Sequence, residues 1–198
     1  MRVGVLGGTF DPVHVGHLWM AEAARDQLGL DRVLLIPASR PPHKTDRDTT
    51  NYGDRVAMLR LSIAGCPGLE VSEIERDESR PSYTAETLAR LHAERPGDEL
   101  WLILGGDSLR DLPTWRAPEE IVKLASLAVL PRPGIDPTDV SSLGARVVML
   151  DGPELAISST ELRARLRVGR SVRYLVPDGA RKWIERHHTY GREGNARG

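Results

Sequence analysis

A glycine-rich stretch near the amino terminus carries two histidines whose placement suits phosphate binding. Residues 7–17 read GGTFDPVHVGH and directly follow an apolar run. Gly7 and Gly8 let the backbone turn sharply and approach a ligand, because glycine has no Cβ in the way. Helical spacing begins at Gly16, so His14 and His17 lie at or just before a helix start. Unpaired N–H groups and the positive end of the helix dipole favour phosphate there, and the stretch predicts a nucleotide phosphate site.

Two better-known phosphate motifs are missing from the sequence, and zinc fits the histidines poorly. No Gly-x-x-x-x-Gly-Lys-[Ser/Thr] occurs, and no Gly-x-Gly-x-x-Gly follows the first apolar run. This argues against a P-loop and against the usual dinucleotide site. His14 and His17 have the spacing of a zinc pair, but zinc takes three or four ligands and the stretch offers no others. The alternative that stays open is a pair that only caps or packs the helix start.

Apolar runs alternate with segments of helical periodicity, which predicts an α/β fold. We expect strands at residues 2–6, 33–36, 69–72, 100–104, 127–130 and 146–150. We expect helices near residues 17–28, 53–64, 83–94, 118–125, 137–143, 159–168 and 178–187. Such alternation gives a Rossmann-like, doubly wound, mostly parallel sheet with helices on both faces, here with a small helical C-terminal part. We expect one domain over residues 1–190 and a frayed tail over residues 191–198.

Polar and glycine-rich segments follow the carboxyl ends of the expected strands. Besides residues 7–17, these segments are 37–44, 105–107, 131–134 and, after a short loop, 157–163. Ligands of open parallel sheets bind beyond the carboxyl ends of the strands, where the strand order reverses. The segments are therefore expected to converge on one crevice. The long polar loop over residues 37–52 is expected to be either functional or disordered.

Residues 157–163, ISSTELR, combine a helix cap with groups that suit an anion. Ser158 followed by Glu161 is a capping box, so a plain capped helix is the structural alternative. Hydroxyls and N–H groups at a helix start also bind anions. Arg163, one turn on, can grip phosphate oxygens in bidentate fashion.

Two further segments have both a structural and a functional interpretation. Gly105 and Asp107 can form a turn with a helix cap, or they can offer bare backbone to adenine and a carboxylate to the ribose. Residues 41–44, PPHK, can be a stiff turn that ends in a solvated lysine. The position of Gly105 at an expected strand end favours the functional interpretation of the first segment.

Composition and charge narrow the class of protein. The 198 residues hold 27 Lys plus Arg against 28 Asp plus Glu, so no overall field attracts nucleic acid or membrane. The single cysteine, Cys66, excludes an internal disulfide and suits a reducing compartment. No signal pattern is found, and no apolar stretch approaches the roughly 20 residues of a membrane span. We therefore expect a cytoplasmic protein whose partners are small molecules, not nucleic acid or membrane.

The motif at residues 7–17 resembles the signature of the nucleotidylyltransferase superfamily, whose core [Thr/His]-x-Gly-His is supplied by residues 14–17. Residues 81–88, PSYTAETL, and 112–116, LPTWR, are similar to segments of the bacterial nicotinate-nucleotide adenylyltransferase family. The resemblance extends from residue 2 to about residue 190 and includes the Ile-Ser-Ser-Thr-x-x-Arg segment unchanged. Departures are small and concern packing: Trp183 and the following histidine pair stand where a tyrosine and apolar residues are expected.

The resemblance implies transfer of the adenylyl group of ATP to nicotinate mononucleotide in NAD biosynthesis, with Mg²⁺ carried by ATP. The residues it implies for holding the reacting phosphates are His14, His17, Lys44 and Arg163. For ATP it implies Gly7, Gly8, Thr9, Phe10, Gly16, Gly105, Asp107, Ile157, Ser158, Ser159 and Thr160. For nicotinate mononucleotide it implies Tyr83, Thr84, Trp115, Arg116 and Arg132. The structural alternative for Trp115 is an ordinary half-buried tryptophan.

Three alternative functions stay open. A phosphopantetheine adenylyltransferase shares the first and last motifs, but it should be shorter and lack the Tyr-Thr and Trp segments. An enzyme that prefers nicotinamide mononucleotide would differ only in how it meets the ring substituent. A nucleotide-binding module without turnover is the third, and the complete motif set argues against it. The oligomeric state is open, a homo-oligomer included.

Overall fold

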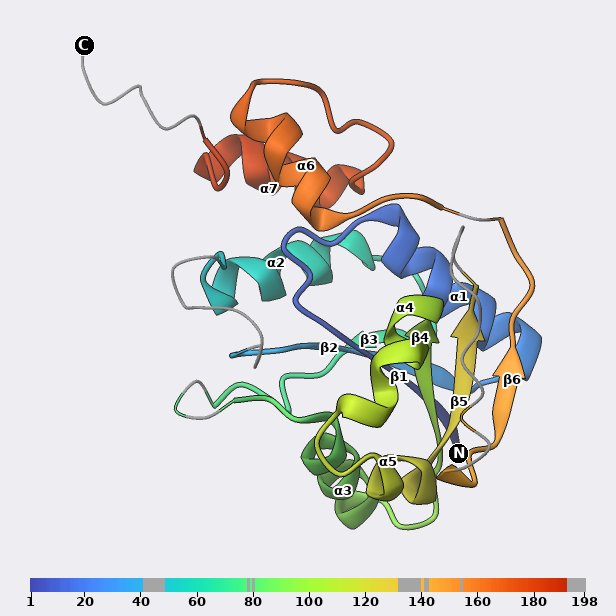
Figure 1. Cartoon of the computed structure of the whole chain (residues 1–198). Helices are drawn as coiled ribbons and strands as arrows, with labels where there is room; N and C mark the ends of the chain where they lie inside the picture. The colour runs from blue at the N-terminus through green and yellow to red at the C-terminus, as the bar shows by residue number, and fades with distance from the viewer. Residues whose placement is uncertain are drawn as a thin grey trace.

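The structure, a computed structural model, describes residues 1–40, 49–77, 79, 81–131, 140, 143–153 and 155–191. Within these residues, parallel strands form a six-stranded sheet in the order β3-β2-β1-β4-β5-β6 (Figure 1). The strands are β1 (Arg2–Gly8), β2 (Arg32–Pro37), β3 (Leu69–Val71), β4 (Glu99–Gly105), β5 (Ala125–Leu130) and β6 (Val147–Met149). The order runs outward in both directions from the β1–β4 pair, which makes this pair the reversal point of a doubly wound sheet.

Side chains alternate along the central strands between two hydrophobic cores, one on each face of the sheet. In β4, Trp101 and Ile103 belong to one core, whereas Leu100, Leu102 and Leu104 belong to the other. Neighbours in a strand point to opposite faces, so a strand covered on both sides is apolar at every position. This burial explains the continuous apolar runs of the sequence.

Helices cover both faces of the sheet. One core takes side chains from α1 (Val15–Leu28), α2 (Tyr52–Ser62), α6 (Ser159–Arg167) and α7 (Asp178–His187). The other takes side chains from α3 (Thr84–Glu94), α4 (Gly106–Asp111) and α5 (Pro118–Leu124). The C-terminal helix α7 packs on α2 (Figure 1). Gly179 permits this approach, because a Cβ there would lie only 2.5 Å from the Leu61 carbonyl oxygen.

The expected fold class is confirmed, and so are most of the expected elements. All six strands, and the six predicted helices that fall on described residues, lie within two residues of the predicted bounds. Two short elements are absent from the expected helices: α4, although a turn with a helix cap was one interpretation of its start, and the 3-10 helix η2 (Leu112–Thr114). Most of the helix expected over residues 137–143 lies outside the described residues, as do residues 192–198 of the expected tail. Among the described helices, none is long and apolar enough to cross a membrane.

Candidate active site

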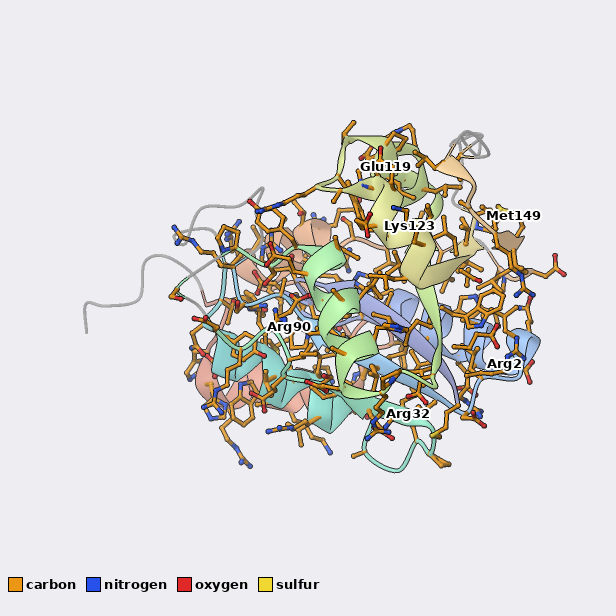
Figure 2. All side chains as sticks on the ribbon, turned by 90° about the horizontal axis from the view of Figure 1, so that it is seen from below. Arg2, Arg32, Arg90, Glu119, Lys123 and Met149 are labelled. Atoms are coloured by element: carbon orange, nitrogen blue, oxygen red, sulfur yellow. The ribbon has the colours of Figure 1, made fainter. Side chains whose placement is uncertain are left out.

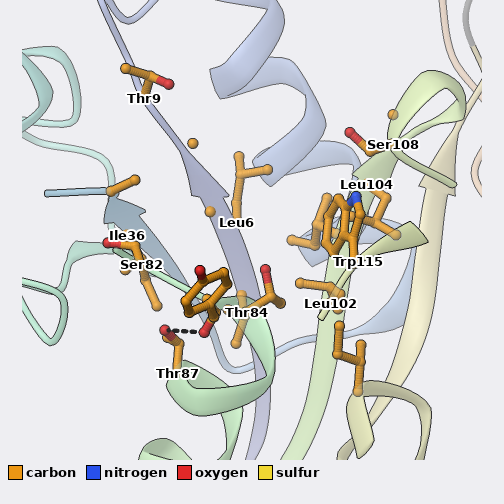
Figure 3. Close-up of a pocket in the computed structure, with 18 of the residues that line it drawn as sticks. Leu6, Thr9, Ile36, Ser82, Thr84, Thr87, Leu102, Leu104, Ser108 and Trp115 are labelled. Atoms are coloured by element: carbon orange, nitrogen blue, oxygen red, sulfur yellow. Dashed lines mark hydrogen bonds between the residues drawn. The ribbon is translucent and has the colours of Figure 1, made fainter. Parts of the chain in front are cut away.

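A cavity of about 730 Å³ lies at the carboxyl ends of β1 and β4, where the strand order reverses (Figure 3). Its walls come from β1 and the loop after it, from α1, from the start of α3 and from residues 102–116. Pockets for small ligands typically measure roughly 300–1,000 Å³. The cavity therefore has the position and the size expected of a ligand site in this fold.

The structure brings ten of the expected site residues to the wall of this cavity. They come from segments far apart in the sequence: Gly7, Gly8, Thr9, His17, Tyr83, Thr84, Gly105, Asp107, Trp115 and Arg116. A second group is not part of the wall: Phe10, His14, Gly16, Ile157, Ser158, Ser159, Thr160 and Arg163. Lys44 and Arg132 lie outside the described residues.

His17 lies in the first turn of α1 and lines the cavity. Its Nδ1 accepts the backbone N–H of His14 at 3.2 Å, so the proton of the neutral ring resides on Nε2, which is then a donor. The His14 ring is buried and stacks on His17, with centroids 3.7 Å apart. A Cβ on Gly16 would lie 3.1 Å from His14 Nδ1. Glycine at this position therefore leaves room for the histidine stack.

The loop between β1 and α1 turns at Phe10, whose φ of 51° lies in the left-handed region. Residues other than glycine adopt this conformation at a cost, and they do so mostly where surrounding structure holds them. Here the ring is 1% exposed and meets His17 edge-on, with centroids 4.9 Å apart. A Cβ on Gly8 would lie 3.2 Å from the Phe10 ring. Phe10 thus supports His17 from the protein side.

Asp11 is the buried anchor of the same loop. Its carboxyl group accepts the Tyr190 hydroxyl at 2.6 Å and the Thr50 N–H at 3.3 Å. Burial, together with the charge of Asp11, raises the pKa of Tyr190 far above its ordinary value, so the hydroxyl keeps its proton and donates. The Arg163 guanidinium lies 3.9 Å from the other carboxyl oxygen. Four segments of the chain therefore meet at one carboxyl group.

The start of α6 is fastened to this loop. Ser158 caps the helix through its side chain, as the capping box predicts. The Ser159 hydroxyl donates to the Pro12 carbonyl oxygen at 2.9 Å, and Arg163 Nη1 donates to the Asp11 carbonyl oxygen at 2.7 Å. The ISSTELR segment thus reaches the histidine loop from the other end of the chain. In this arrangement both side chains hold the loop backbone.

Arg55 is a site-building residue that the sequence did not reveal. Its side chain is 1% exposed and donates to main-chain carbonyl oxygens of four residues. The distances are 2.8 Å to Thr9, 2.7 Å to Ala38, 3.2 Å to Ser39 and 2.9 Å to Thr50. A guanidinium offers five N–H donors in a rigid fork, which lets one side chain tie three loop segments together. It also places a positive charge behind the loop that follows β1.

The opposite part of the cavity is aromatic and polar. Tyr83 is the N-cap of α3, so the first N–H groups of that helix, beginning at Thr84, lie at the cavity wall. Arg116 lies 4.5 Å from the centre of the Tyr83 ring and 3.6 Å from the Glu86 carboxyl group. Figure 3 shows Trp115 on the β4 side of the cavity and Thr84 on the α3 side. A flat ligand can lie between them.

Glu75 is a residue of the cavity wall that, like Arg55, was not predicted from the sequence. It is 8% exposed and accepts a hydrogen bond from the Thr87 hydroxyl (dashed in Figure 3). Burial raises the pKa of Glu75, whereas hydrogen bonds from Thr87 and Ser82 and the charge of Arg90 lower it. Burial is the largest of these effects. A carboxyl group thus faces the cavity in an environment that disfavours its charge.

No cluster of three or more His, Cys, Asp or Glu side chains able to hold a metal ion is found among the described residues. The donors described above are imidazole, hydroxyl, guanidinium and backbone N–H groups. All of them suit anions. The arrangement can therefore bind an anionic ligand, such as one that carries phosphate. Figure 2 shows the same molecule turned by 90°, with its outer surface carrying charged residues such as Arg2 and Lys123.

Comparison with known proteins gives consistent results. A family model described as cytidylyltransferase-like matches residues 5–165. The chain is 45% identical over 195 residues to a protein of Herpetosiphon aurantiacus named "Probable nicotinate-nucleotide adenylyltransferase", covering 96% of this chain and 98% of the relative. A relative of the same name from Roseiflexus sp. is 46% identical over 194 residues, covering 95% and 97%. The fold is similar to that of Plasmodium falciparum nicotinic acid mononucleotide adenylyltransferase complexed with NaAD, at a TM-score of 0.82 and 18% identity, over 96% of this chain and 97% of that one.

Proposed function

We propose that this chain, which belongs to the cytidylyltransferase-like family and within it to the nicotinate-nucleotide adenylyltransferases, transfers the adenylyl group of ATP to nicotinate mononucleotide. The products are nicotinate adenine dinucleotide and pyrophosphate, a step of NAD biosynthesis. The observation that carries the proposal is a continuous cavity at the β1–β4 reversal, whose wall includes both the histidine loop and the aromatic side chains. The exposed free thiol of Cys66 supports a reducing, cytoplasmic location as part of the same proposal.

The acceptor supplies its own nucleophile. A phosphate monoester loses its second proton near pH ~6, so the phosphate of nicotinate mononucleotide is largely dianionic at neutral pH. No general base is needed to activate it. The protein's task is to bring two polyanions together in line and to stabilise the charge that develops on the departing pyrophosphate.

The histidine loop and α6 hold the adenylyl donor in this proposal. His17 Nε2 donates to a reacting phosphate oxygen, and His14 fixes the orientation of that ring by stacking on it. Arg163 Nη1 and Nη2 contact Asp11 and Thr160, and the other N–H groups of its guanidinium can reach phosphate oxygens. Lys44, which lies outside the described residues, is assigned by the resemblance to neutralising further phosphate charge.

The remaining expected ATP contacts divide between backbone and side chain. The glycines at the ends of β1 and β4 offer close backbone approach, and Asp107 accepts from a ribose hydroxyl. Thr160 offers its hydroxyl to the triphosphate, and Ser158 and Ser159 form the helix start whose N–H groups can donate to it, while their hydroxyls donate to Glu161 and to the Pro12 carbonyl oxygen. Ile157 precedes this cap and positions it.

Mg²⁺ enters the site with ATP in this proposal. An ion carried in by ATP would keep water and phosphate ligands and would use few protein ligands. Bound in this way, Mg²⁺ neutralises part of the triphosphate charge. The histidines and Arg163 then act on the phosphate oxygens that the ion leaves exposed.

The aromatic wall holds the pyridine ring of the acceptor. Trp115 can stack on the ring, and Arg116, positioned over Tyr83, brings positive charge near the ring carboxylate. Backbone N–H groups at Thr84 can donate to the same carboxylate. Arg132, which lies outside the described residues, is assigned by the resemblance to binding nicotinate mononucleotide.

One assay separates the candidate functions. The protein is incubated with Mg·ATP and, in turn, nicotinate mononucleotide, nicotinamide mononucleotide or phosphopantetheine, and pyrophosphate release is followed. We expect the fastest release with nicotinate mononucleotide. Faster release with either of the other acceptors would assign the enzyme to that acceptor, and no release with any of them would point to a binding module.

A further inference from the structure

Glu75 has no part in the mechanism above, although it is buried in the wall of the cavity. It lies in the connection between β3 and α3 and is 8% exposed. A buried carboxyl group is costly unless hydrogen bonds compensate it. The Thr87 hydroxyl donates to this one. The Glu75 carboxyl group is therefore buried next to the acceptor wall, and a hydrogen bond compensates part of the free-energy cost of burying it.

The same carboxyl group governs the start of α3. The Thr87 hydroxyl, which donates to Glu75, also lies 3.3 Å from the Tyr83 carbonyl oxygen. Thr87 is thus held between the buried carboxyl group and the residue that caps the helix. Because Tyr83 and Thr84 form the acceptor wall, the position of Glu75 bears on the position of that wall.

A separate set of polar contacts ties the histidine loop to the segment after β2 and to Ser82. Arg55 joins the carbonyl oxygens of Thr9 and Ser39. The Ser39 hydroxyl donates to the Asp77 carbonyl oxygen at 3.1 Å, so Ser82 is the donor in the 3.3 Å contact between the Ser39 and Ser82 hydroxyls. These contacts belong to the donor side of the cavity, whereas the hydrogen bond from Thr87 to Glu75 belongs to the start of α3.

We propose that Glu75 is a positioning residue that sets the acceptor wall, and so determines the affinity for nicotinate mononucleotide and not for ATP. The proposal rests on the function proposed above. The carboxyl oxygen keeps Thr87 in place, and Thr87 keeps the first turn of α3 in line with Trp115. Losing the acceptor oxygen frees that turn, whereas the glycines of the donor side are held by β1 and β4.

The test compares Glu75→Ala, Glu75→Gln and Thr87→Val with the wild type. We measure KM for each substrate and, without ATP, the Kd of nicotinate mononucleotide by calorimetry. For Glu75→Ala and Thr87→Val we expect the KM and the Kd for nicotinate mononucleotide each to rise about ten-fold. This is the effect expected from the loss of one buried hydrogen bond. KM for ATP should not change. Glu75→Gln keeps an oxygen that accepts from Thr87, so it should restore most of the affinity.

The matched control is Glu73→Ala. Glu73 lies in the same connection but pairs with Arg60 and does not line the cavity, so its loss should leave both KM values unchanged. Acceptor constants for Thr87→Val within about two-fold of wild type, or a parallel rise in KM for ATP, would overturn the proposal. Thr87→Val carries the test if Glu75→Ala does not fold. A wild type that binds nicotinate mononucleotide without turnover would refute the proposed function, and the calorimetric comparison would still decide the role of Glu75.

Discussion

The Tyr190 hydroxyl donates a 2.6 Å hydrogen bond to the Asp11 carboxyl group and so joins two residues 179 positions apart. Asp11 is fully buried, and Tyr190 is 8% exposed. The bond fastens the end of the chain after α7 to the loop that carries the histidines. The C-terminal helices are therefore part of the construction of the site.

Removing this hydroxyl should destabilise the protein. Tyr190→Phe leaves a buried carboxyl oxygen without its donor, which costs about 1.5–3 kcal/mol for a hydrogen bond to a charged group. Urea unfolding measures the loss. Tyr174→Phe is the control, because Tyr174 is 84% exposed. Equal unfolding midpoints for the two variants would contradict the structural role of the bond.

Removing the His17 side chain should act on the chemical step. His17→Ala deletes the Nε2 donor assigned to the reacting phosphate, and kcat should fall roughly 10²-fold or more, as for other transition-state donors. Steady-state pyrophosphate release measures it. His92→Ala, at an exposed position of α3, is the control. A near-normal kcat with a raised KM would show that His17 only binds substrate.

Replacing Arg55 should lower the stability of the folded protein. Arg55→Met leaves buried carbonyl oxygens without donors, and we expect a loss of about 3 kcal/mol or more. That corresponds to a Tm lower by roughly 10 °C. Arg55→Lys should recover only part of the loss, because an ammonium group cannot span all four carbonyl groups.

The control for Arg55 lies on the same helix. Arg60 is 60% exposed and pairs with Glu73, so Arg60→Met should change Tm very little. Differential scanning fluorimetry compares the three variants. If Arg55→Met had the same Tm as Arg60→Met, the buried guanidinium would have no part in holding the loops.

Glu75 should make stability depend on pH. Burial raises its pKa in the folded protein above the ordinary value of 4.5. Its contribution is therefore fully present below about pH 4.5 and is lost as the pH rises through the folded pKa. The wild type should lose stability relative to Glu75→Gln over this rise and then level off. Urea unfolding of both proteins between about pH 4 and pH 8 tests this prediction. A difference in the free energy of unfolding that stays constant over this pH range would contradict it.

The central strands could be predicted because a strand that is buried on both faces has apolar residues at consecutive positions. Trp101 and Ile103 face one core while Leu102 and Leu104 face the other, so β4 is an uninterrupted apolar run. Helices α1 and α7 were predicted within two residues for the corresponding reason of periodicity. Helix α4 was missed because six residues that begin with Gly106 hold too few turns to show a period.

The residues that build the site divide in the same way. His17 sits in a motif that follows an expected strand, so topology predicts its place at the site, whereas Thr84 and Trp115 were predicted only from the resemblance of their segments to a known family; all three line the cavity. Arg55 and Glu75 were missed because charged residues in such positions are usually solvated. Their burial is decided by carbonyl and hydroxyl groups from distant segments, and no local pattern records those partners.

The tie between Asp11 and Tyr190 also orders events during synthesis. A ribosome adds about 5–20 residues per second, so the tyrosine emerges roughly 10–35 s after the aspartate that it anchors. During that interval the nascent chain has its histidine loop but not the hydrogen bond from Tyr190 that holds the loop in the folded protein. The histidine loop can therefore reach its final arrangement only after residue 190 has been synthesised.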